Sequence, residues 1–278
     1  HRGRNPLNHN HLREPAKKSV NVNLFPHFAV QCPCSPWAGC YNTRMMMTTL
    51  TVGETDPITV QDPMMEVPTR VRDLESIVGG MSKPSKMPGY CYSLPAKRCK
   101  VGSSLRSVKG SVCHGCYAMK GFYNFPKTAE ALEHRFRCIR DPRWSAAMVA
   151  LIRKRSIRYF RWHDSGDLQS VAHLHNIVSI CRMTPGTRHW LPTREYRMVD
   201  EYVGEWGPLP TNLVVRASAH MIGKVAPSRF EHSSMVLPKG VESTDEGFTC
   251  PAPQQGNECR KCRACWSQNA KIIAYRVH

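Results

Sequence analysis

The chain has 278 residues, of which 41% are apolar and 22% charged, and its formal net charge is +18. This composition is typical of a globular protein and excludes a disordered one, and no run of about 18 apolar residues is present that would span a membrane. Because the first residues also lack the apolar core of a secretory leader, we expect a cytoplasmic location. The positive charge favours nucleic acid as a partner. The sequence does not indicate an oligomeric state.

Residues 1–80 are expected to be a poorly ordered N-terminal extension or linker. The first 44 residues are rich in His, Asn, Pro and Arg and show no helical or strand periodicity. Residues 48–80 are polar with scattered prolines, which is typical of loops. Three cysteines in this part, Cys32, Cys34 and Cys40, have a spacing that could chelate a metal ion.

Residues 81–245 are predicted to form a β/α domain. It opens with a loop-rich stretch over 91–123 that carries GYCYSLPAKRC and GSVCHGCYAMKGFY. A helix is expected near Thr128–Arg140. The dipeptide Asp141-Pro142 then offers an N-cap and a first-turn proline for a second helix, which runs to about Arg155.

Strands and helices then alternate. Strands are predicted over 157–162, 188–191 and 212–215, and each is followed by a polar cluster. Helices are predicted over 169–181 and around Met198–Trp206. This alternation is the signature of parallel β/α units. The predicted fold class is therefore α/β, with repeated units forming a partial or complete TIM-barrel-like fold and an open doubly wound sheet as the alternative.

The loops after parallel strands line the active site in such folds. Histidine and aspartate there can perform acid–base chemistry or bind a divalent metal, and arginine can bind phosphate or carboxylate. The alternative is structural: Asp167 or Ser170 caps a helix, and the arginines pair with nearby carboxylates. The candidate catalytic residues on this rim are His163, Asp164, Asp167, Arg194, Glu195 and Arg216, with His220 beside them.

The thirteen cysteines form two main clusters. In a reducing compartment, clustered cysteines are typical of metal ligands or catalytic thiols rather than of disulfides. The first cluster consists of Cys99, Cys113 and Cys116, which we predict to bind a metal cofactor. Three thiolates leave one iron of a cubane open for a substrate, although Cys91, His114 or a cysteine of the tail could complete the set.

The second cluster lies in the tail, 246–278, which is predicted to be a small, separate metal-binding module. Its predicted ligands are Cys250, Cys259, Cys262 and Cys265, the last three in a C-x2-C-x2-C run. Such a run is more typical of a 4Fe–4S cluster than of zinc, which usually takes two separated C-x2-C pairs. Cys138 and Cys181 fall on apolar helix faces and are expected to be buried free thiols.

Five motifs occur in one order along the chain: GSVCHGCYAMKGFY, YFRWHDSGD, LPTRE, NLVVRASA and the terminal cysteine run ending in YRVH. Over roughly residues 82–278 this order resembles the phage "gene product 88" domain family. The resemblance implies a phage or prophage origin and the host cytoplasm. The C-x2-C-Tyr-Ala segment is also similar to radical S-adenosylmethionine-type iron–sulfur proteins, which implies S-adenosylmethionine as a further cofactor. The spacing from Cys99 to Cys113 is longer than in those enzymes.

Two functional hypotheses follow. The first is a phage-encoded iron–sulfur protein of unassigned activity with one or two 4Fe–4S clusters, and one form of this hypothesis is an enzyme that acts on or near nucleic acid. The second is a zinc-stapled nucleic-acid-binding protein without catalysis. A redox-sensing or host-takeover adaptor is a third alternative. The sequence does not decide whether the protein is an enzyme.

Overall fold

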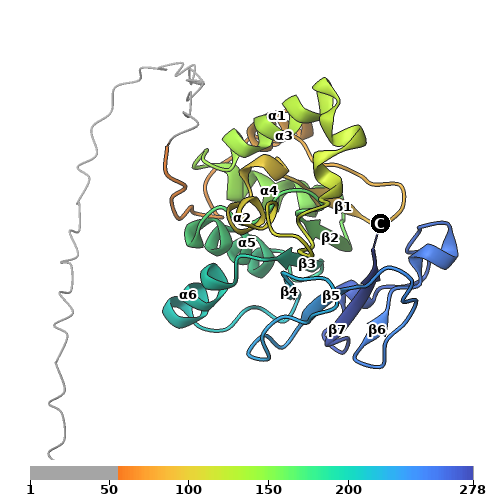
Figure 1. Cartoon of the computed structure of the whole chain (residues 1–278). Coiled ribbons are helices and arrows are strands. Elements are labelled where there is room, and N and C mark those ends of the chain that lie inside the picture. Colours follow the sequence, from red (N-terminus) through yellow and green to blue (C-terminus); the bar gives the residue numbers. More distant parts are fainter. Residues whose placement is uncertain (1–55, 278) are drawn as a thin grey trace, which may run out of the picture. The chain divides into compact units, whose positions relative to one another are not determined.

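The computed structural model describes residues 56–277 and contains a seven-stranded sheet with the order β1-β2-β3-β4-β5-β7-β6 (Figure 1). Every neighbouring pair of strands is parallel. The strands are β1 (Tyr90–Tyr92), β2 (Tyr159–Trp162), β3 (Arg188–Thr193), β4 (Leu213–Ser218), β5 (Ser233–Leu237), β6 (Phe248–Thr249) and β7 (Ile272–Arg276). The predictions for residues 1–55, including those for their three cysteines, lie outside the described residues.

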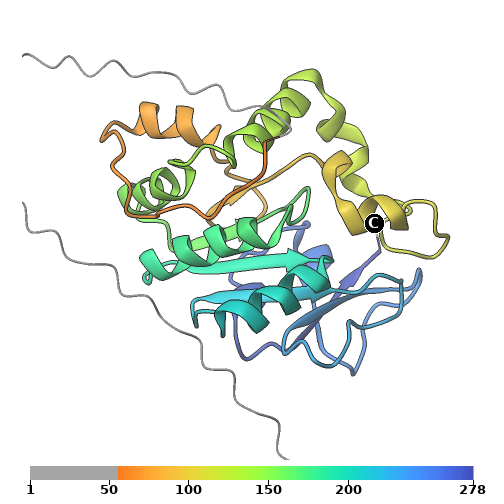
Figure 2. The ribbon, with the colours of Figure 1, turned by 90° about the vertical axis from the view of Figure 1, so that its left-hand side faces the viewer.

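Helices connect the strands and cover one face of the sheet, as Figure 2 shows for the central strands. They are α1 (Val71–Val78), α2 (Lys100–Leu105), α3 (Pro126–Cys138), α4 (Trp144–Lys154), α5 (Val171–Met183) and α6 (Tyr196–Trp206). Short 3-10 turns lie at 96–98, 117–119, 121–124, 252–255 and 264–266. Among the described residues, no helix is long and apolar enough to cross a membrane.

The predicted α/β class and the three central strands are confirmed. The predicted strands correspond to β2, β3 and β4, and the predicted helices between them correspond to α5 and α6. Strands that follow one another in the chain are neighbours as far as β5, an order that barrels share. Within the described residues, however, β1 and β6 are the two edges of the sheet and do not pair, so no barrel closure is seen.

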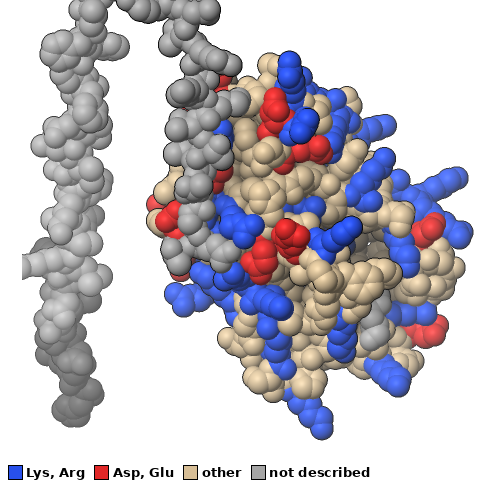
Figure 3. All heavy atoms as spheres, turned by 90° about the horizontal axis from the view of Figure 1, so that it is seen from above, with Lys and Arg blue, Asp and Glu red and all other residues tan. Residues whose placement is uncertain are grey.

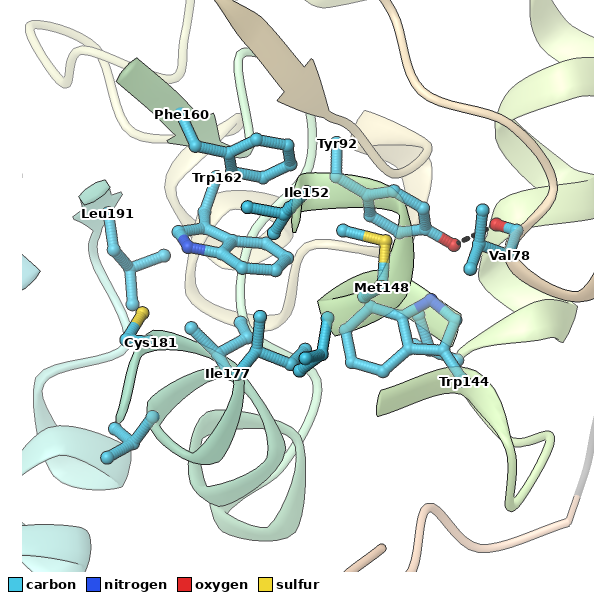
Figure 4. Close-up of a cluster of buried hydrophobic side chains, with 14 of the residues drawn as sticks. Val78, Tyr92, Trp144, Met148, Ile152, Phe160, Trp162, Ile177, Cys181 and Leu191 are labelled. Atoms are coloured by element: carbon cyan, nitrogen blue, oxygen red, sulfur yellow. Dashed lines mark hydrogen bonds between the residues drawn. The ribbon is translucent and has the colours of Figure 1, made fainter. Parts of the chain in front are cut away.

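The main core lies between the sheet and the helices (Figure 4). Side chains alternate along β2, so Phe160 and Trp162 point into this core while the residue between them points to the opposite face. Trp144 from α4 packs on Trp162 with ring centroids 6.1 Å apart. The buried Tyr92 hydroxyl donates to the carbonyl oxygen of Val78 at 2.7 Å, which satisfies its polar atom. Each such large apolar side chain contributes about 1.5–3 kcal/mol by leaving water.

The helix α1 corrects the predicted domain boundary at residue 80. Leu74 and Val78 are fully buried in the main core, where α1 packs against α4. Gln61, further upstream, is also buried and donates to the carbonyl oxygen of Ile139 at 2.9 Å. The scattered prolines and polar residues hid this short amphipathic helix, and the domain therefore includes residues that were expected to be linker.

The tail is not a separate module, which corrects the second predicted boundary. β7 pairs with β5 on one side and β6 on the other, so the tail completes the sheet. The tail also covers the face opposite the helices, where Trp266 packs on Trp190 with ring centroids 5.2 Å apart. The indole Nε1–H of Trp266 donates to the carbonyl oxygen of Phe160 at 2.9 Å. The short apolar run IIAYR forms a strand that the nearby cysteines obscured.

Candidate functional site

The segment between β1 and α3 carries Cys99, Cys113 and Cys116 to the edge of the sheet where the parallel strands end. Two contacts fix it to the loop after β4. The Val112 N–H donates to the carbonyl oxygen of His220 at 2.9 Å, and the Ile222 N–H donates to that of Gly110 at 3.0 Å. The predicted first cysteine cluster therefore lies on the rim that was predicted from the strand ends.

Gly102 of α2 lines the space between two of these thiols. A Cβ atom at this position would lie 3.6 Å from the Sγ of Cys99 and 3.6 Å from the Sγ of Cys113. It would also lie 2.9 Å from the Cβ of Cys99, closer than side chains pack. The two sulfurs thus face the same small space, and only a residue without a side chain fits beside them.

Among residues 56–277, no three His, Cys, Asp or Glu side chains converge closely enough to hold a single metal ion. A zinc ion requires its thiolates at about 2.3 Å from one centre. A cubane instead presents separate irons, each with its own thiolate, so its ligands stand further apart.

Burial favours the neutral, protonated form of the thiols in this cluster. Burial raises the pKa of Cys99 far above its ordinary value, and Asp167 and the neighbouring thiols raise it further. Burial also raises the pKa of Cys113, while the guanidinium of Arg194 opposes that shift. Arg106 lowers the pKa of both thiols. A metal ion bound here would have to displace these protons, because only the thiolate form of cysteine is a metal ligand.

Asp167 organises the rim between β2 and β3. Its carboxylate accepts hydrogen bonds from the Thr193 hydroxyl at 2.5 Å, the Arg194 N–H at 2.9 Å and the Leu168 N–H at 2.8 Å. Burial nevertheless raises its pKa above the ordinary value. The structural alternative was a helix cap, and that role falls to Ser170, whose side chain accepts from the His173 N–H at 3.0 Å at the start of α5. Asp167 instead connects the loop after β2 to the end of β3. A catalytic role for Asp167 stays a prediction.

Glu195 connects the rim to the thiol cluster. The carboxylate accepts a hydrogen bond from the Val101 N–H at 2.8 Å, in the first turn of α2, directly after Cys99. Burial raises the pKa of Glu195. The neighbouring His220 donates from Nε2 to the carbonyl oxygen of Arg194 at 3.1 Å and stacks on Tyr196. Glu195 therefore positions the helix that carries the first thiol.

His163 and Asp164 retain polar atoms without partners. His163 is 3% exposed, has a positive φ of 57° and has no hydrogen-bond partner at either ring nitrogen. Burial lowers its pKa well below the ordinary value. Asp164 accepts from the Tyr123 hydroxyl at 3.2 Å, and its other carboxylate oxygen is buried and unpaired. The Tyr117 hydroxyl donates to the Asp164 carbonyl oxygen. These groups have unused capacity for a ligand.

The two tyrosines were not among the predicted site residues. Both lie within the GSVCHGCYAMKGFY motif, so their place beside Cys116 was the available signal. Their contact with Asp164 depends on how the segment folds back over the loop after β2. Sequence spacing alone does not show that return.

Arg216 does not lie on the rim, which corrects its predicted position. β4 continues through Ser218, so Arg216 lies within the strand and points to the face that the tail covers. The side chain is fully buried, and burial lowers its pKa. Its guanidinium donates only to backbone carbonyl oxygens, those of Ser233, Ala264, Ser267, Ala270 and Lys271. Arg216 thus ties the tail to the sheet.

The tail thiols gather over the same face. The Cys250 N–H donates to the carbonyl oxygen of Ala274 at 2.8 Å, and the Cys259 N–H donates to that of Lys86 at 2.8 Å. Burial raises the pKa of both Cys250 and Cys259, and Cys262 raises each further. These thiols thus form a second cluster, separate from the first.

Cys265 is the most buried of the tail thiols. Burial raises its pKa to about 11, which a hydrogen bond with the Tyr275 hydroxyl, 3.2 Å away, partly offsets. The positive charges of Arg216 and Arg161 also lower this pKa. Two guanidinium groups on the face of the sheet opposite the helices, those of Arg161 and Arg216, therefore lie near the sulfur of Cys265.

A family model described as gene product 88 matches residues 69–268. The match includes both cysteine clusters and every rim residue discussed above. It begins close to α1, in agreement with the place of that helix in the core. Neither the curated proteins nor the solved structures provide a match to this chain.

Proposed function

The chain belongs to the gene product 88 family, and we propose that it is an iron–sulfur protein whose working site is the thiol cluster at the strand ends. The observation that carries the proposal is the grouping of Cys99 and Cys113 around Gly102, where only a residue without a side chain fits. Cys116 is the third ligand. A cubane there would supply redox or Lewis-acid chemistry at its open iron.

The surrounding residues are suited to position a substrate at that site. Arg194 lies close enough to Cys113 to affect its pKa, and its backbone is fixed by Asp167. A guanidinium group held in this way binds a carboxylate or phosphate group. Because the third thiolate completes the protein's contribution, the open iron leaves room for a small ligand such as S-adenosylmethionine, which is the finer form of the proposal.

The tail thiols are proposed to hold a second cluster. Cys250, Cys259 and Cys262 influence one another electrostatically, and Cys265 lies beside Arg161 and Arg216. Positive guanidinium groups beside thiolates would stabilise a site of net negative charge. Because this site lies away from the rim, on the face opposite the helices, its proposed role is structural or electron transfer.

Anaerobic purification followed by iron and sulfide analysis tests the proposal. We expect a brown protein with roughly four irons for each occupied cubane site. The variants Cys99→Ala, Cys113→Ala and Cys116→Ala should each lose the iron of the rim site and keep that of the tail. Cys138→Ala is the matched control, because that thiol belongs to neither cluster, and it should keep the full content. Colourless protein loaded with zinc would instead support the zinc-stapled alternative.

A further inference from the structure

The segment from 93 to 129 has a charge pattern unlike that of the whole chain. It contains no Asp or Glu, whereas the chain as a whole has 21 acidic residues against 39 Lys and Arg. Its basic residues are Lys97, Arg98, Lys100, Arg106, Lys109, Lys120 and Lys127. We call this stretch the basic segment. A charge of one sign concentrated in one segment creates a local positive field.

All five lysines of the basic segment are exposed, and none forms a salt bridge with a described residue. Lys100 lies near enough to Glu195 to lower the pKa of that carboxyl group. Lys and Arg side chains are also widespread on the face shown in Figure 3, where Asp and Glu are fewer. A polyanion would therefore meet cationic side chains that remain available for it.

Aromatic side chains protrude from the same segment. Phe122 is 77% exposed, Phe125 is 54% exposed and the ring of Tyr117 is 46% exposed. Phe122 and Phe125 contact each other edge to face, with ring centroids 5.1 Å apart. Among the residues that the structure describes, the one other exposed aromatic side chain is Phe248. Exposed apolar rings concentrated in one place mark a binding surface more often than isolated ones do.

The base of this aromatic group is fixed beside the rim. Tyr117 follows Cys116 directly, and its hydroxyl donates to the carbonyl oxygen of Asp164. Tyr123 packs on Tyr117 with ring centroids 5.8 Å apart and donates to the Asp164 carboxylate. In Figure 2 the basic segment, in yellow, lies at the end of the sheet toward which the strand arrows point. The exposed rings are therefore presented next to the thiol cluster.

We propose that the basic segment binds single-stranded nucleic acid, with bases stacked on Phe122 and Phe125 and phosphates held by the lysines. Stacking requires bases that are not already stacked in a duplex, so the aromatic rings favour single strands. A membrane surface is a poorer fit, because the rings stand on short turns and not on one side of a long amphipathic helix. The proposal goes beyond the proposed function, since it holds whether or not a metal cluster is bound.

Fluorescence anisotropy with the full chain tests the proposal, on protein whose metal content has been measured. The probes are a labelled DNA 20-mer, an RNA of the same sequence, the corresponding DNA duplex and vesicles with anionic phospholipid. We expect tighter binding of the single strands than of the duplex. The two single strands distinguish DNA from RNA as the natural ligand, because both present the same stacking and phosphate chemistry.

Ring substitutions separate stacking from simple apolar contact. Phe122→Ala and Phe125→Ala should each weaken single-strand binding by about five- to 150-fold. Phe122→Leu should weaken it almost as much, because leucine keeps the apolar volume but has no π-face. Phe248→Ala is the matched control and should bind as the unchanged protein does. Both phenylalanines are exposed, so circular dichroism should show the fold unchanged.

Charge substitutions test the phosphate contacts. Lys120→Gln combined with Lys127→Gln should lower the slope of log K against log salt by about 1.4, at roughly 0.7 per phosphate contact on a single strand. Lys154→Gln is the control. Lys154 ends α4 shortly before β2 begins, so it lies toward the amino ends of the strands, whereas the basic segment follows the carboxyl end of β1. Equal or tighter duplex binding, vesicle binding in place of oligonucleotide binding, or unchanged affinity in both phenylalanine variants would overturn the proposal. Metal-free protein with ring-dependent binding would uphold it while refuting the cluster.

Discussion

At the scale of single residues, Gly102 has no room for a side chain beside the rim thiols. An alanine there would place a methyl group against Cys99 and in front of the sulfur of Cys113. Gly102 lies inside α2, where alanine normally stabilises a helix by about 1 kcal/mol. Helix stability thus favours alanine at this position, whereas the space beside the thiols admits only glycine.

We therefore expect Gly102→Ala to weaken metal retention while the protein stays folded. Changes beside metal ligands typically cost about 10- to 100-fold in metal affinity. Iron content after competition with a chelator measures the effect. Gly115→Ala is the matched control, because a Cβ at Gly115 would meet nothing within 4 Å. Equal iron retention by the two variants would show that the space beside Gly102 holds no metal group.

His189 and His173 make the stability of the fold sensitive to acid. Burial lowers the pKa of His189 to about 3 and that of His173 to about 3. A histidine that is neutral in the folded state but protonated in the unfolded chain stabilises the fold fully above its unfolded pKa, near 6.5. That contribution is lost as the pH falls from 6.5 toward 3.

We expect the free energy of unfolding to fall below pH 6.5 by up to about 1.4 kcal/mol per pH unit for each of these histidines. In the variant His189→Gln the free energy of unfolding should fall less steeply with decreasing pH. The slope should lose the contribution of one histidine, because glutamine does not titrate. Urea unfolding at several pH values measures the slope. His134→Gln, at an exposed position of α3, is the control. An unchanged slope in His189→Gln would contradict the buried, neutral state of His189.

At the scale of elements, α1 provides the clearest test of the domain boundary. Leu74 is fully buried against α4, whereas Val71 of the same helix is 38% exposed. Leu74→Ala should lower the free energy of unfolding by about 2–5 kcal/mol, as loss of a buried leucine side chain does. Val71→Ala should lower it by less than about 1 kcal/mol. Chemical denaturation of both variants measures the difference, and equal stability would place α1 outside the core.

The central strands were predictable because each carries several apolar residues before a polar turn. β2, β3 and β4 all follow this pattern, and their helices show clear apolar spacing. β1 has three residues and lies among the cysteine motifs, so no periodicity could reveal it. β7 was hidden for a similar reason, because its short apolar run comes soon after the cysteine run. Pairing across many residues, and not local pattern, defines these two strands.

At the scale of the whole molecule, the sequence indicated the chemistry of the site but not its full arrangement. The thiol types and the polar clusters after β2 and β3 could be predicted from spacing. The position of the tail on the face of the sheet opposite the helices could not be predicted. It depends on pairing between β5 and β7 and on hydrogen bonds from Arg216 to distant carbonyl groups. For the same reason the sequence predicted Arg216 on the rim, although its side chain lies within β4 on the face that the tail covers.

The fold separates two thiol clusters that are both cysteine-rich in sequence. The first lies at the strand ends beside Asp167 and Arg194. The second lies on the face of the sheet opposite the helices, beside Arg161 and Arg216. Only the first adjoins the exposed aromatic rings of the basic segment. A nucleic acid bound to the basic segment would therefore meet the rim cluster first.

The central claim is that Cys99, Cys113 and Cys116 hold a cubane with one iron free of protein ligands. Mössbauer spectroscopy of iron-57-reconstituted protein tests this most directly, with Cys259→Ala and Cys262→Ala present together to remove the tail site. We predict a 4Fe–4S spectrum in which one iron differs from the other three and shifts when a small ligand is added. Iron that fails to bind this variant, or four equivalent irons that no added ligand affects, would contradict the claim.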